Sequence, residues 1–415
     1  MRFLHLADLH LGKSIYGINL IDTGDQRYWT EQFLELADRL KPDAVVIAGD
    51  VYDRGLPSGK AAQLLSFMLT RLADLDIPAL LTAGNHDSIQ HLSFLSPLLA
   101  KQQVFISKPL DQSVELTHMT LQDEHGPVTF WLMPYISPAL ASQVLGNDEI
   151  RDYDTAVRQI LGEQTVDFTQ RNVLIAHQNV TANGQEVERG GSESQVGGIG
   201  QVDYTAFDGF DYVALGHIHS SYSVGRETVR YAGSPLAYHF NETRQPAKGP
   251  LLVTLPEKNG KPVIERHEII PLHHMREIKG VYDDIQSEAV AHPWENEYLK
   301  IVLTDRRISP EISSFLREAA AAHSSTVLEL TSEYNSFMGD AVLSGSKDMH
   351  EKPVEALFAE FYTARNNGVE PDAQELDLLA FVGDLTRNKL AGREEPKDED
   401  FRKILDYVLG QEGQK

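Results

Sequence analysis

Five short apolar runs that end in polar residues limit the fold of this 415-residue chain more than any other feature. The runs are FLHLAD from Phe3, AVVIAGD from Ala44, ALLTAGNHD from Ala79, NVLIAHQ from Asn172 and YVALGHIH from Tyr212. Near-continuous apolar runs of this length are typical of strands that are covered on both faces. The sequence therefore predicts buried strands at these five places.

Helix-like segments lie between the early runs, at residues 30–40 and 58–72. In the second segment the apolar residues recur at helical spacing, and they are Ala61, Leu64, Leu65, Met68, Leu69 and Leu72. Alternating strands and helices predict a layered α/β domain. In such domains ligands bind beyond the carboxyl ends of the strands, where all five polar clusters fall.

The polar clusters predict a metal centre. Their candidate metal ligands are Asp8, His10, Asp50, Asn85, His177, His217 and His219. Carboxylate, amide and imidazole groups together suit manganese, iron, zinc or magnesium, and one carboxylate such as Asp50 can bridge two ions. The chain contains no cysteine, which excludes thiolate metal sites and cysteine nucleophiles.

Two ions held in this way can activate a water for attack on phosphorus, so hydrolysis without a covalent enzyme intermediate is expected. His86 directly follows a predicted ligand, and we expect it to protonate the leaving oxygen or to stabilise the transition state. Asp87 is expected to orient the His86 ring. A single Asp-x-His or Gly-Asp pair is common by chance, but five clusters in order at strand ends argue against coincidence.

Three other histidines are assigned to structural positions. His5 lies inside the first run and is expected to be a buried core residue, whereas His273 and His274 have no strand-end context and are expected to be exposed.

The net charge of −24 weighs against nucleic-acid binding, which normally requires a basic excess. About half of the acidic excess falls in residues 281–415, and bound dications would supply positive charge where a phosphate must bind. No run reaches the 18 apolar residues of a membrane span, and the N-terminal run resembles a strand more than a signal peptide. We therefore expect a cytoplasmic protein with no membrane contact.

The order D-x-H, GDxxD, GNHD, H and GHxH resembles the calcineurin-like metallophosphoesterases. Finer details, spread from residue 2 to about 365, resemble the SbcD family of bacterial DNA repair nuclease subunits. These details are HLADLHLG, AGDVYDRG, AGNHDS, VGGIGQVDYTAFDGFDYVALGHIH, YAGSPLAYHFNE and VEALFAEFY. The resemblance implies a metallophosphoesterase β-sandwich flanked by helices, two divalent ions and a homodimer through residues 58–72 and 90–99.

The resemblance also implies which residues hold each ion. One ion is assigned to Asp8, His10, Asp50 and His219, and the other to Asp50, Asn85, His177 and His217, with His86 as the catalytic histidine. Manganese is the expected metal, with magnesium as the alternative. Archaeal relatives have a histidine where this chain has Asp53, so no histidine role transfers to that position.

Four regions are predicted. Residues 1–272 form the metallophosphoesterase (nuclease) domain, and residues 273–335 form a small α/β capping domain with strands at 275–281, 298–305 and 326–333 and a helix at 310–323. Residues 336–352 are a linker, and 353–415 form a helical segment that the resemblance implies docks on the coiled coil of an SbcC-type ATPase. Its apolar face is Val354, Leu357, Phe358, Phe361 and Tyr362, which could instead fold back on the chain's own domain. The glycine-rich loop at 186–200 lacks a P-loop lysine and is expected to be a surface connection.

Three functions are compatible with these features. The first is a nuclease that cleaves double-stranded DNA ends and hairpins, as exonuclease and endonuclease, in DNA repair, recombination and replication. The second is a phosphoprotein or nucleotide phosphatase, which the GDVYDRG stretch favours but GNHD and the long C-terminal extension do not. The third is a DNA-end scaffold without catalysis, which gives no reason for a full ligand set.

Overall fold

The computed structural model describes residues 1–110, 114–182, 200–244 and 247–334, together with Thr363 and Pro371. The chain divides into two compact units. The first contains Met1–Ile278, Ser287–Ile301 and Ser313–Glu329, and the second contains Lys279–Gln286, Val302–Ile312 and the residues from Leu330. The predicted metal ligands all belong to the first unit.

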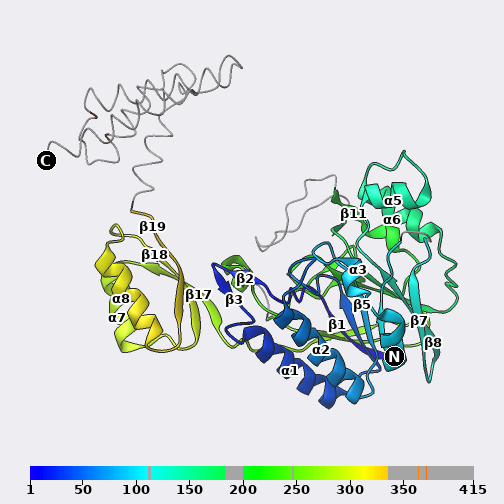
Figure 1. Cartoon of the computed structure of the whole chain (residues 1–415), viewed down its shortest axis with the longest axis horizontal. Coiled ribbons are helices and arrows are strands. Elements are labelled where there is room, and N and C mark those ends of the chain that lie inside the picture. Colours follow the sequence, from blue (N-terminus) through cyan, green and yellow to red (C-terminus); the bar gives the residue numbers. More distant parts are fainter. Residues whose placement is uncertain (111–113, 183–199, 245–246, 335–362, 364–370, 372–415) are drawn as a thin grey trace. The chain divides into compact units, whose positions relative to one another are not determined.

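The first unit contains two six-stranded sheets (Figure 1). The first sheet has the order β16 (Val263–Arg266), β15 (Leu251–Thr254), β1 (Arg2–Leu6), β4 (Ala44–Ala48), β5 (Ala79–Thr82) and β6 (Val104–Ile106). The second has the order β13 (Ser223–Val224), β14 (Arg226–Tyr231), β12 (Tyr212–Gly216), β9 (Arg171–His177), β8 (Gly126–Met133) and β7 (Thr117–Asp123). Strands β1, β4, β5 and β6 are parallel neighbours, as are β14, β12, β9 and β8. The five predicted strands are confirmed as β1, β4, β5, β9 and β12.

The two sheets pack face to face through a shared apolar core. Phe3 lies at its centre, with its ring edge-on to Phe130 at 5.5 Å and to Tyr212 at 5.6 Å between centroids. Each such fully buried side chain contributes about 1.5–3 kcal/mol relative to exposure. Alternate residues of the same strands, such as Leu4 and Leu6, face the opposite way into a second core. Burial on both faces explains why these strands are apolar at nearly every position.

Helices cover the outer faces of both sheets. On the first sheet these are α1 (Asp25–Leu40) and α2 (Gly59–Asp74), and on the second they are α5 (Pro138–Leu145) and α6 (Tyr153–Gly162). The six apolar residues predicted for one face of α2 are all buried in the core below it. The layered β-sandwich flanked by helices is thus confirmed.

Shorter elements connect these layers. They are β2 (Ser14–Ile15), β3 (Ile18–Asn19), α3 (Ile89–Leu92), α4 (Ser96–Leu99), η1 (Ala100–Gln102), β10 (Val180–Thr181), β11 (Val202–Asp203), η3 (Tyr204–Phe207) and η4 (Phe240–Arg244). Among the described residues, no helix is both long and apolar enough to cross a membrane.

A separate three-stranded sheet has the order β17 (His274–Gly280), β18 (Glu297–Leu303) and β19 (Thr326–Ser332), with helices α7 (Tyr282–Ala291) and α8 (Pro310–Ala321). The three strands and α8 agree with the prediction, whereas α7, whose buried residues are Ile285 and Ala289, was not predicted. The domain boundaries at 272 and 335 remain predictions. The linker at 336–352 and the docking segment at 353–415 lie outside the described residues, except for Thr363 and Pro371.

Candidate metal centre

The predicted ligands converge because their strands end at one edge of the sandwich. Each parallel strand brings its carboxyl end, and the ligands that follow it, to this edge. Four ligands adopt positive φ, namely Asp8 at 54°, His10 at 41°, Asp50 at 47° and His217 at 100°. Such conformations cost non-glycine residues about 1–3 kcal/mol each and persist only where the surroundings enforce them. Here Asp8 Oδ1 accepts a hydrogen bond from the His217 amide at 2.9 Å, which joins the two sheets at the site.

The first ligand group is Asp8, His10, Asp50 and His219, all buried. Nε2 of His10 lies 3.2 Å from Nε2 of His219 and 3.5 Å from Oδ2 of Asp50. Asp8 Oδ2 is buried and has no hydrogen-bond partner among the described residues. An unpaired buried carboxylate oxygen is costly, and a cation coordinated by these atoms would satisfy it. The residues therefore fit a divalent metal ion.

The second ligand group is Asp50, Asn85, His177 and His217. Asn85 Oδ1 lies 3.1 Å from His177 Nε2 and 3.0 Å from His217 Nδ1, and Asp50 Oδ2 lies 3.3 Å from His177 Nε2. The same Asp50 oxygen thus faces ring nitrogens of both groups. Three sets of donor atoms lie within 4.8 Å of one another and could hold an ion: Asp8, His10 and His219; Asp8, Asp50 and His177; and His10, Asp50 and His86.

Glycines directly before three ligands allow the close approach of the loops. A Cβ on Gly84 would lie 2.1 Å from Asp50 Oδ1, and one on Gly216 would lie 1.9 Å from the Ala48 carbonyl oxygen. Gly49 has φ 80° and would place a Cβ 2.3 Å from His177 Nδ1. These contacts are far shorter than van der Waals distance, which explains the Gly-Asp, Gly-Asn and Gly-His pairs of the sequence.

Burial and charge set the protonation of the site. Burial raises the pKa of Asp8 to about 6 and lowers the pKa of His10 to about 4. Burial alone would lower the pKa of His177, but the Asp50 carboxylate outweighs it and raises that pKa to about 9. Burial also opposes ionisation of Asp50, yet His177 and His10 hold the pKa of Asp50 well below its usual range. A metal ion must therefore displace a proton from His177.

The structure places His86 beside the predicted ligands. Its ring is edge-on to the His10 ring with centroids 4.8 Å apart, and its backbone amide donates to Asp50 Oδ1 at 2.9 Å. Nδ1 of His86 lies 3.0 Å from the Asp53 carbonyl oxygen. Because a carbonyl only accepts, Nδ1 carries the proton and Nε2 remains available. The side chain is partly exposed, unlike His10, so a substrate can reach it.

The predicted role of Asp87 requires correction. Its carboxylate does not contact the His86 ring but accepts three backbone hydrogen bonds, from Val51 at 3.1 Å, Tyr52 at 2.8 Å and Gly84 at 2.9 Å. It therefore ties the loop after β4, which contains Asp50, to the loop after β5. The Asp53 carbonyl orients His86 instead, because the loop hydrogen bonds leave the Asp87 oxygens directed at backbone amides.

Asp53, to which the sequence assigned no role, lies beside the predicted ligand His10. Its Oδ1 lies 3.0 Å from Lys13 Nζ and 3.5 Å from His10 Nδ1. Burial opposes its ionisation, but the contacts with His10 and Lys13 lower the pKa of Asp53 below its usual range. Asp53 thus faces the outer nitrogen of a predicted metal ligand.

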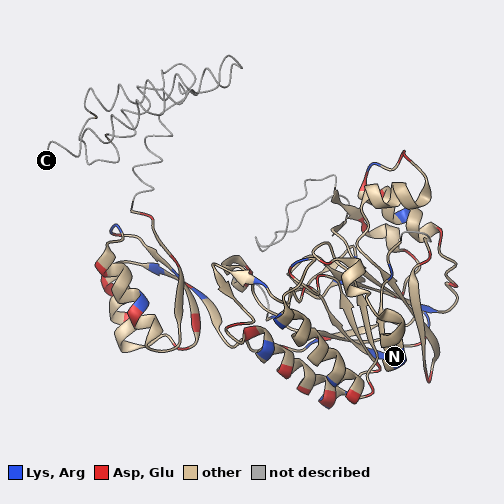
Figure 2. Ribbon diagram, viewed as in Figure 1, with Lys and Arg blue, Asp and Glu red and all other residues tan. Residues whose placement is uncertain are grey.

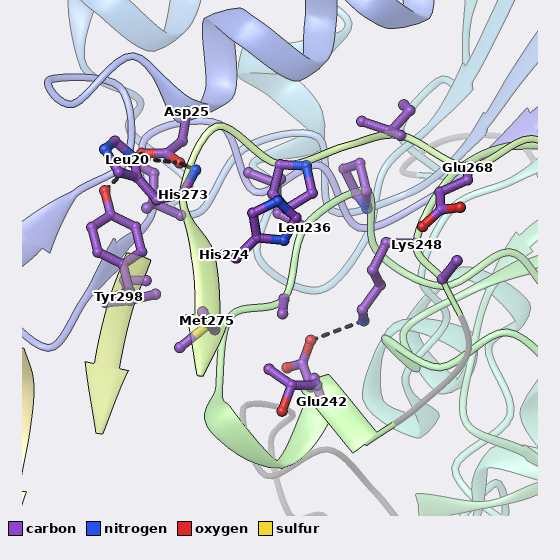
Figure 3. A pocket seen from close by; sticks show the side chains of 17 residues that line it. Leu20, Asp25, Leu236, Glu242, Lys248, Glu268, His273, His274, Met275 and Tyr298 are labelled. Carbon is purple, nitrogen blue, oxygen red and sulfur yellow. Dashed lines mark hydrogen bonds and ion pairs between the residues drawn. The ribbon is translucent and has the colours of Figure 1, made fainter. Parts of the chain in front are cut away.

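Supporting residues beyond the strand ends were missed in the sequence. Glu242 is 1% exposed and its Oε1 lies 3.2 Å from His219 Nδ1, and it pairs with Lys248 (Figure 3). The Tyr238 hydroxyl donates to the Leu9 carbonyl at 2.8 Å. Glu242 and Tyr238 lie in YAGSPLAYHFNE, which contributed only to the family resemblance because it follows no predicted strand.

The three structural histidines differ in outcome. His5 is fully buried with its Nδ1 3.1 Å from the Tyr212 hydroxyl, and His274 is exposed, both as predicted. His273 was wrongly expected to be exposed: it is partly buried, and its Nδ1 lies 3.0 Å from Asp25 Oδ1. Asp25 also accepts from the Tyr298 hydroxyl at 2.7 Å (Figure 3). A buried carboxylate therefore holds His273 in place.

Known proteins share both parts of the chain. Residues 1–221 match the calcineurin-like phosphoesterase family, and residues 271–366 match a domain described as the type 5 capsule protein repressor C-terminal domain. The SbcD subunit of nuclease SbcCD from Staphylococcus epidermidis is 31% identical over 314 residues, which cover 74% of this chain and 79% of that protein. Its counterpart from Staphylococcus saprophyticus is 30% identical over 306 residues, which cover 73% and 78%.

Among solved structures, one from a study of an archaeal phosphodiesterase aligns with 64% of this chain and 100% of its own, at 10% identity and a TM-score of 0.27. That likeness is too slight to support the assignment, which the family match over more than half of the chain and the two SbcD subunits support. The chain belongs to the calcineurin-like phosphoesterase family and, within it, to the group of SbcD nuclease subunits.

Proposed function

We propose that this chain is the nuclease subunit of an SbcCD-type complex and uses two metal ions to hydrolyse DNA phosphodiester bonds at double-strand ends and hairpins. Such a subunit would act as exonuclease and endonuclease in DNA repair, recombination and replication. The observation that supports the two-ion reaction most strongly is Asp50 Oδ2, which lies 3.5 Å from His10 Nε2 and 3.3 Å from His177 Nε2. The relatives named as nucleases support the choice of DNA.

Asp8, His10, Asp50 and His219 would hold one ion, and Asp50, Asn85, His177 and His217 would hold the other. Two bound divalent ions lower the pKa of a water nucleophile and stabilise the charge of the transition state. The mixture of imidazole, amide and carboxylate donors favours manganese over magnesium.

His86 would serve as the general acid. Its Nδ1–H donates to the Asp53 carbonyl oxygen, which fixes the ring and leaves Nε2 for a proton delivered to the leaving oxygen. Its partial exposure beside the buried ligands is suited to contact with a phosphate. Asp87 would position the two loops and take no part in proton transfer.

Part of the acidic excess lies away from the proposed phosphate site. In Figure 2, Asp and Glu residues mark α1, and Glu31, Glu35 and Asp38 are exposed there. This helix covers the outer face of the first sheet, whereas the ligands follow the strand ends. Local positive charge from two dications would then dominate where DNA binds.

A phosphomonoesterase is the second candidate, because Arg54 of GDVYDRG has an 80% exposed side chain next to Asp53. The deciding experiment compares linear and hairpin DNA, a phosphopeptide and a simple phosphodiester ester, each with and without manganese. We expect metal-dependent cleavage of both DNA substrates, with full dependence on added metal. Rapid hydrolysis of the phosphopeptide with intact DNA would favour the phosphatase, and no hydrolysis at all would favour a scaffold.

We further propose that residues 353–415 dock on the coiled coil of an SbcC-type ATPase, since relatives of the chain are named as subunits of a complex. This segment lies outside the described residues apart from Thr363 and Pro371. Leu357, Phe358 and Phe361 could each contribute about 1.5–3 kcal/mol before ordering costs if they were buried against the partner. Phe358→Glu should abolish partner capture and leave metal-dependent cleavage unchanged. The cytoplasmic location remains a prediction.

A homodimer is proposed through the second of the two segments first expected, residues 90–99, and not through the first, residues 58–72. The apolar face of α2 is buried in the chain's own core and is not available. Around α4, in contrast, Phe94 is 71% exposed, Leu95 51% and Leu98 56%. Clustered exposed apolar side chains of this kind mark contact surfaces.

A further inference from the structure

Glu242 lies on the opposite side of His219 from the proposed metal position. Its carboxylate comes from the 3-10 turn η4 and is almost completely buried. Oε1 lies 3.2 Å from His219 Nδ1, and Oε2 accepts from the Tyr238 amide at 3.2 Å. Because a carboxylate accepts here, Nδ1 of His219 carries the proton and Nε2 is the nitrogen that can bind metal.

Lys248 fixes both Glu242 and the backbone of His219. Its Nζ donates to Glu242 Oε2 at 3.0 Å, to the His219 carbonyl oxygen at 2.7 Å and to Ser234 Oγ at 2.9 Å. The ion pair lines a cavity of about 210 Å³, and Figure 3 shows the two charged groups facing each other there. His219 is thus held at its ring by the buried Glu242 and at its main chain by the partly buried Lys248.

His177, one of the two histidines of the second ligand group, has a weaker support than His219. Nδ1 of His177 donates to the neutral carbonyl oxygen of Ala48 at 2.8 Å. An imidazole is a stronger metal ligand when its outer N–H donates to a carboxylate than when it donates to a carbonyl. The full negative charge of the carboxylate stabilises positive charge on the ring. His219 and His177 therefore differ in the group that accepts from the outer nitrogen, a carboxylate for His219 and a carbonyl for His177.

We propose that Glu242 is a positioning residue that sets the orientation and donor strength of His219, and so the affinity of the ion held by Asp8, His10, Asp50 and His219. Lys248 compensates the buried charge of Glu242 and keeps it in place. This inference rests on the two-ion centre of the proposed function. It predicts that substitution of Glu242 lowers the affinity for this ion and leaves the affinity for the other ion unchanged.

The test titrates manganese into the full-length, metal-stripped protein by calorimetry. The variants are Glu242→Gln, Lys248→Met and, as control, Glu268→Gln, which removes an exposed carboxylate from the wall of the same cavity. In wild type we expect two ions. Glu242→Gln should weaken one of them 10- to 100-fold and leave the other within about twofold, as loss of an outer carboxylate does. Lys248→Met should act in the same direction, and Glu268→Gln should match wild type.

Electron paramagnetic resonance provides a second measurement, because a change in stability alone would not alter the spectrum of the bound manganese pair. The exchange-coupled spectrum of a manganese pair should give way to a single-ion spectrum at concentrations that saturate wild type. Equal weakening of both ions together with a lowered melting temperature, or unchanged affinities in both Glu242→Gln and Lys248→Met, would overturn the inference. A wild-type protein that binds one ion would instead overturn the two-ion proposal on which it rests.

Discussion

At the scale of single residues, Asp50 and His86 have separable roles, because Asp50 belongs to both ligand groups whereas His86 is expected to act on the substrate. Asp50→Asn should lose bound manganese as well as activity. His86→Ala should keep both ions and lose about 10²- to 10⁴-fold in turnover, the usual worth of a positioned acid. Equilibrium dialysis and kinetics on the same preparations check this, and a His86→Ala protein without metal would show that His86 is a ligand.

Metal binding should depend on pH in a defined direction. His177 has a pKa of about 9 and Asp8 a pKa of about 6 in the absence of an ion, and both must lose their protons to act as ligands. Between pH 6 and 9 one proton is displaced, so manganese affinity should rise about tenfold per pH unit. Below pH 6 the dependence should steepen, and above pH 9 it should level off.

The measurement is a series of manganese titrations in buffers of different ionisation enthalpy, which gives the number of protons released. Asp8→Asn should remove the extra steepness below pH 6. An affinity that does not change from pH 6 to 8 would contradict the protonation of His177.

Gly84 offers a test of the backbone itself. Gly84→Ala would place its Cβ 2.1 Å from Asp50 Oδ1, so either Asp50 or the loop must shift and manganese binding should be lost. Gly59→Ala is the matched control, because nothing lies within 4 Å of its added Cβ and the residue starts α2. The control should bind manganese normally and gain up to about 1 kcal/mol in stability. Normal manganese affinity in Gly84→Ala would show that Asp50 does not need its present position.

At the scale of elements, the sequence predicted those strands and helices whose buried residues follow a regular pattern along the chain. The strands β1, β4, β5, β9 and β12 could be predicted because both of their faces are covered, and their ligands because each follows a strand end. The partners of Asp87, Glu242 and His273 could not be predicted, because each contact joins a loop to residues that are distant in the sequence. Helix α7 was also missed, although it buries as many residues as α8, which was predicted.

The exposed residues around α4 lead to a prediction about assembly. Phe94→Glu together with Leu98→Glu should convert a dimer to a monomer, because two charges would then lie in an apolar contact. Val290→Glu, at a position in α7 that is also 71% exposed, is the control and should leave the dimer intact. Light scattering at micromolar concentration measures the mass. A monomeric wild-type protein would contradict the proposed dimer. A double variant that is still a dimer would show that the contact involves other residues.

At the scale of the whole molecule, the two sheets of the sandwich each supply part of one candidate metal centre. The first sheet contributes Asp8, His10, Asp50 and Asn85, and the second contributes His177, His217 and His219. The sandwich core that holds Phe3 against Phe130 and Tyr212 therefore also sets the spacing of the ligands. Residues as far apart in the sequence as 8 and 217, which strand ends and the family resemblance assigned to one site, are thereby brought into contact.

The central claim, a pair of ions that share Asp50, is tested most directly by anomalous scattering from crystals grown with manganese. We predict two peaks, one among Asp8, His10 and His219 and the other among Asn85, His177 and His217, with the Asp50 carboxylate between them. Ions in such pairs are about 3.5–4 Å apart. A single peak, or two peaks that do not both contact Asp50, would contradict the account.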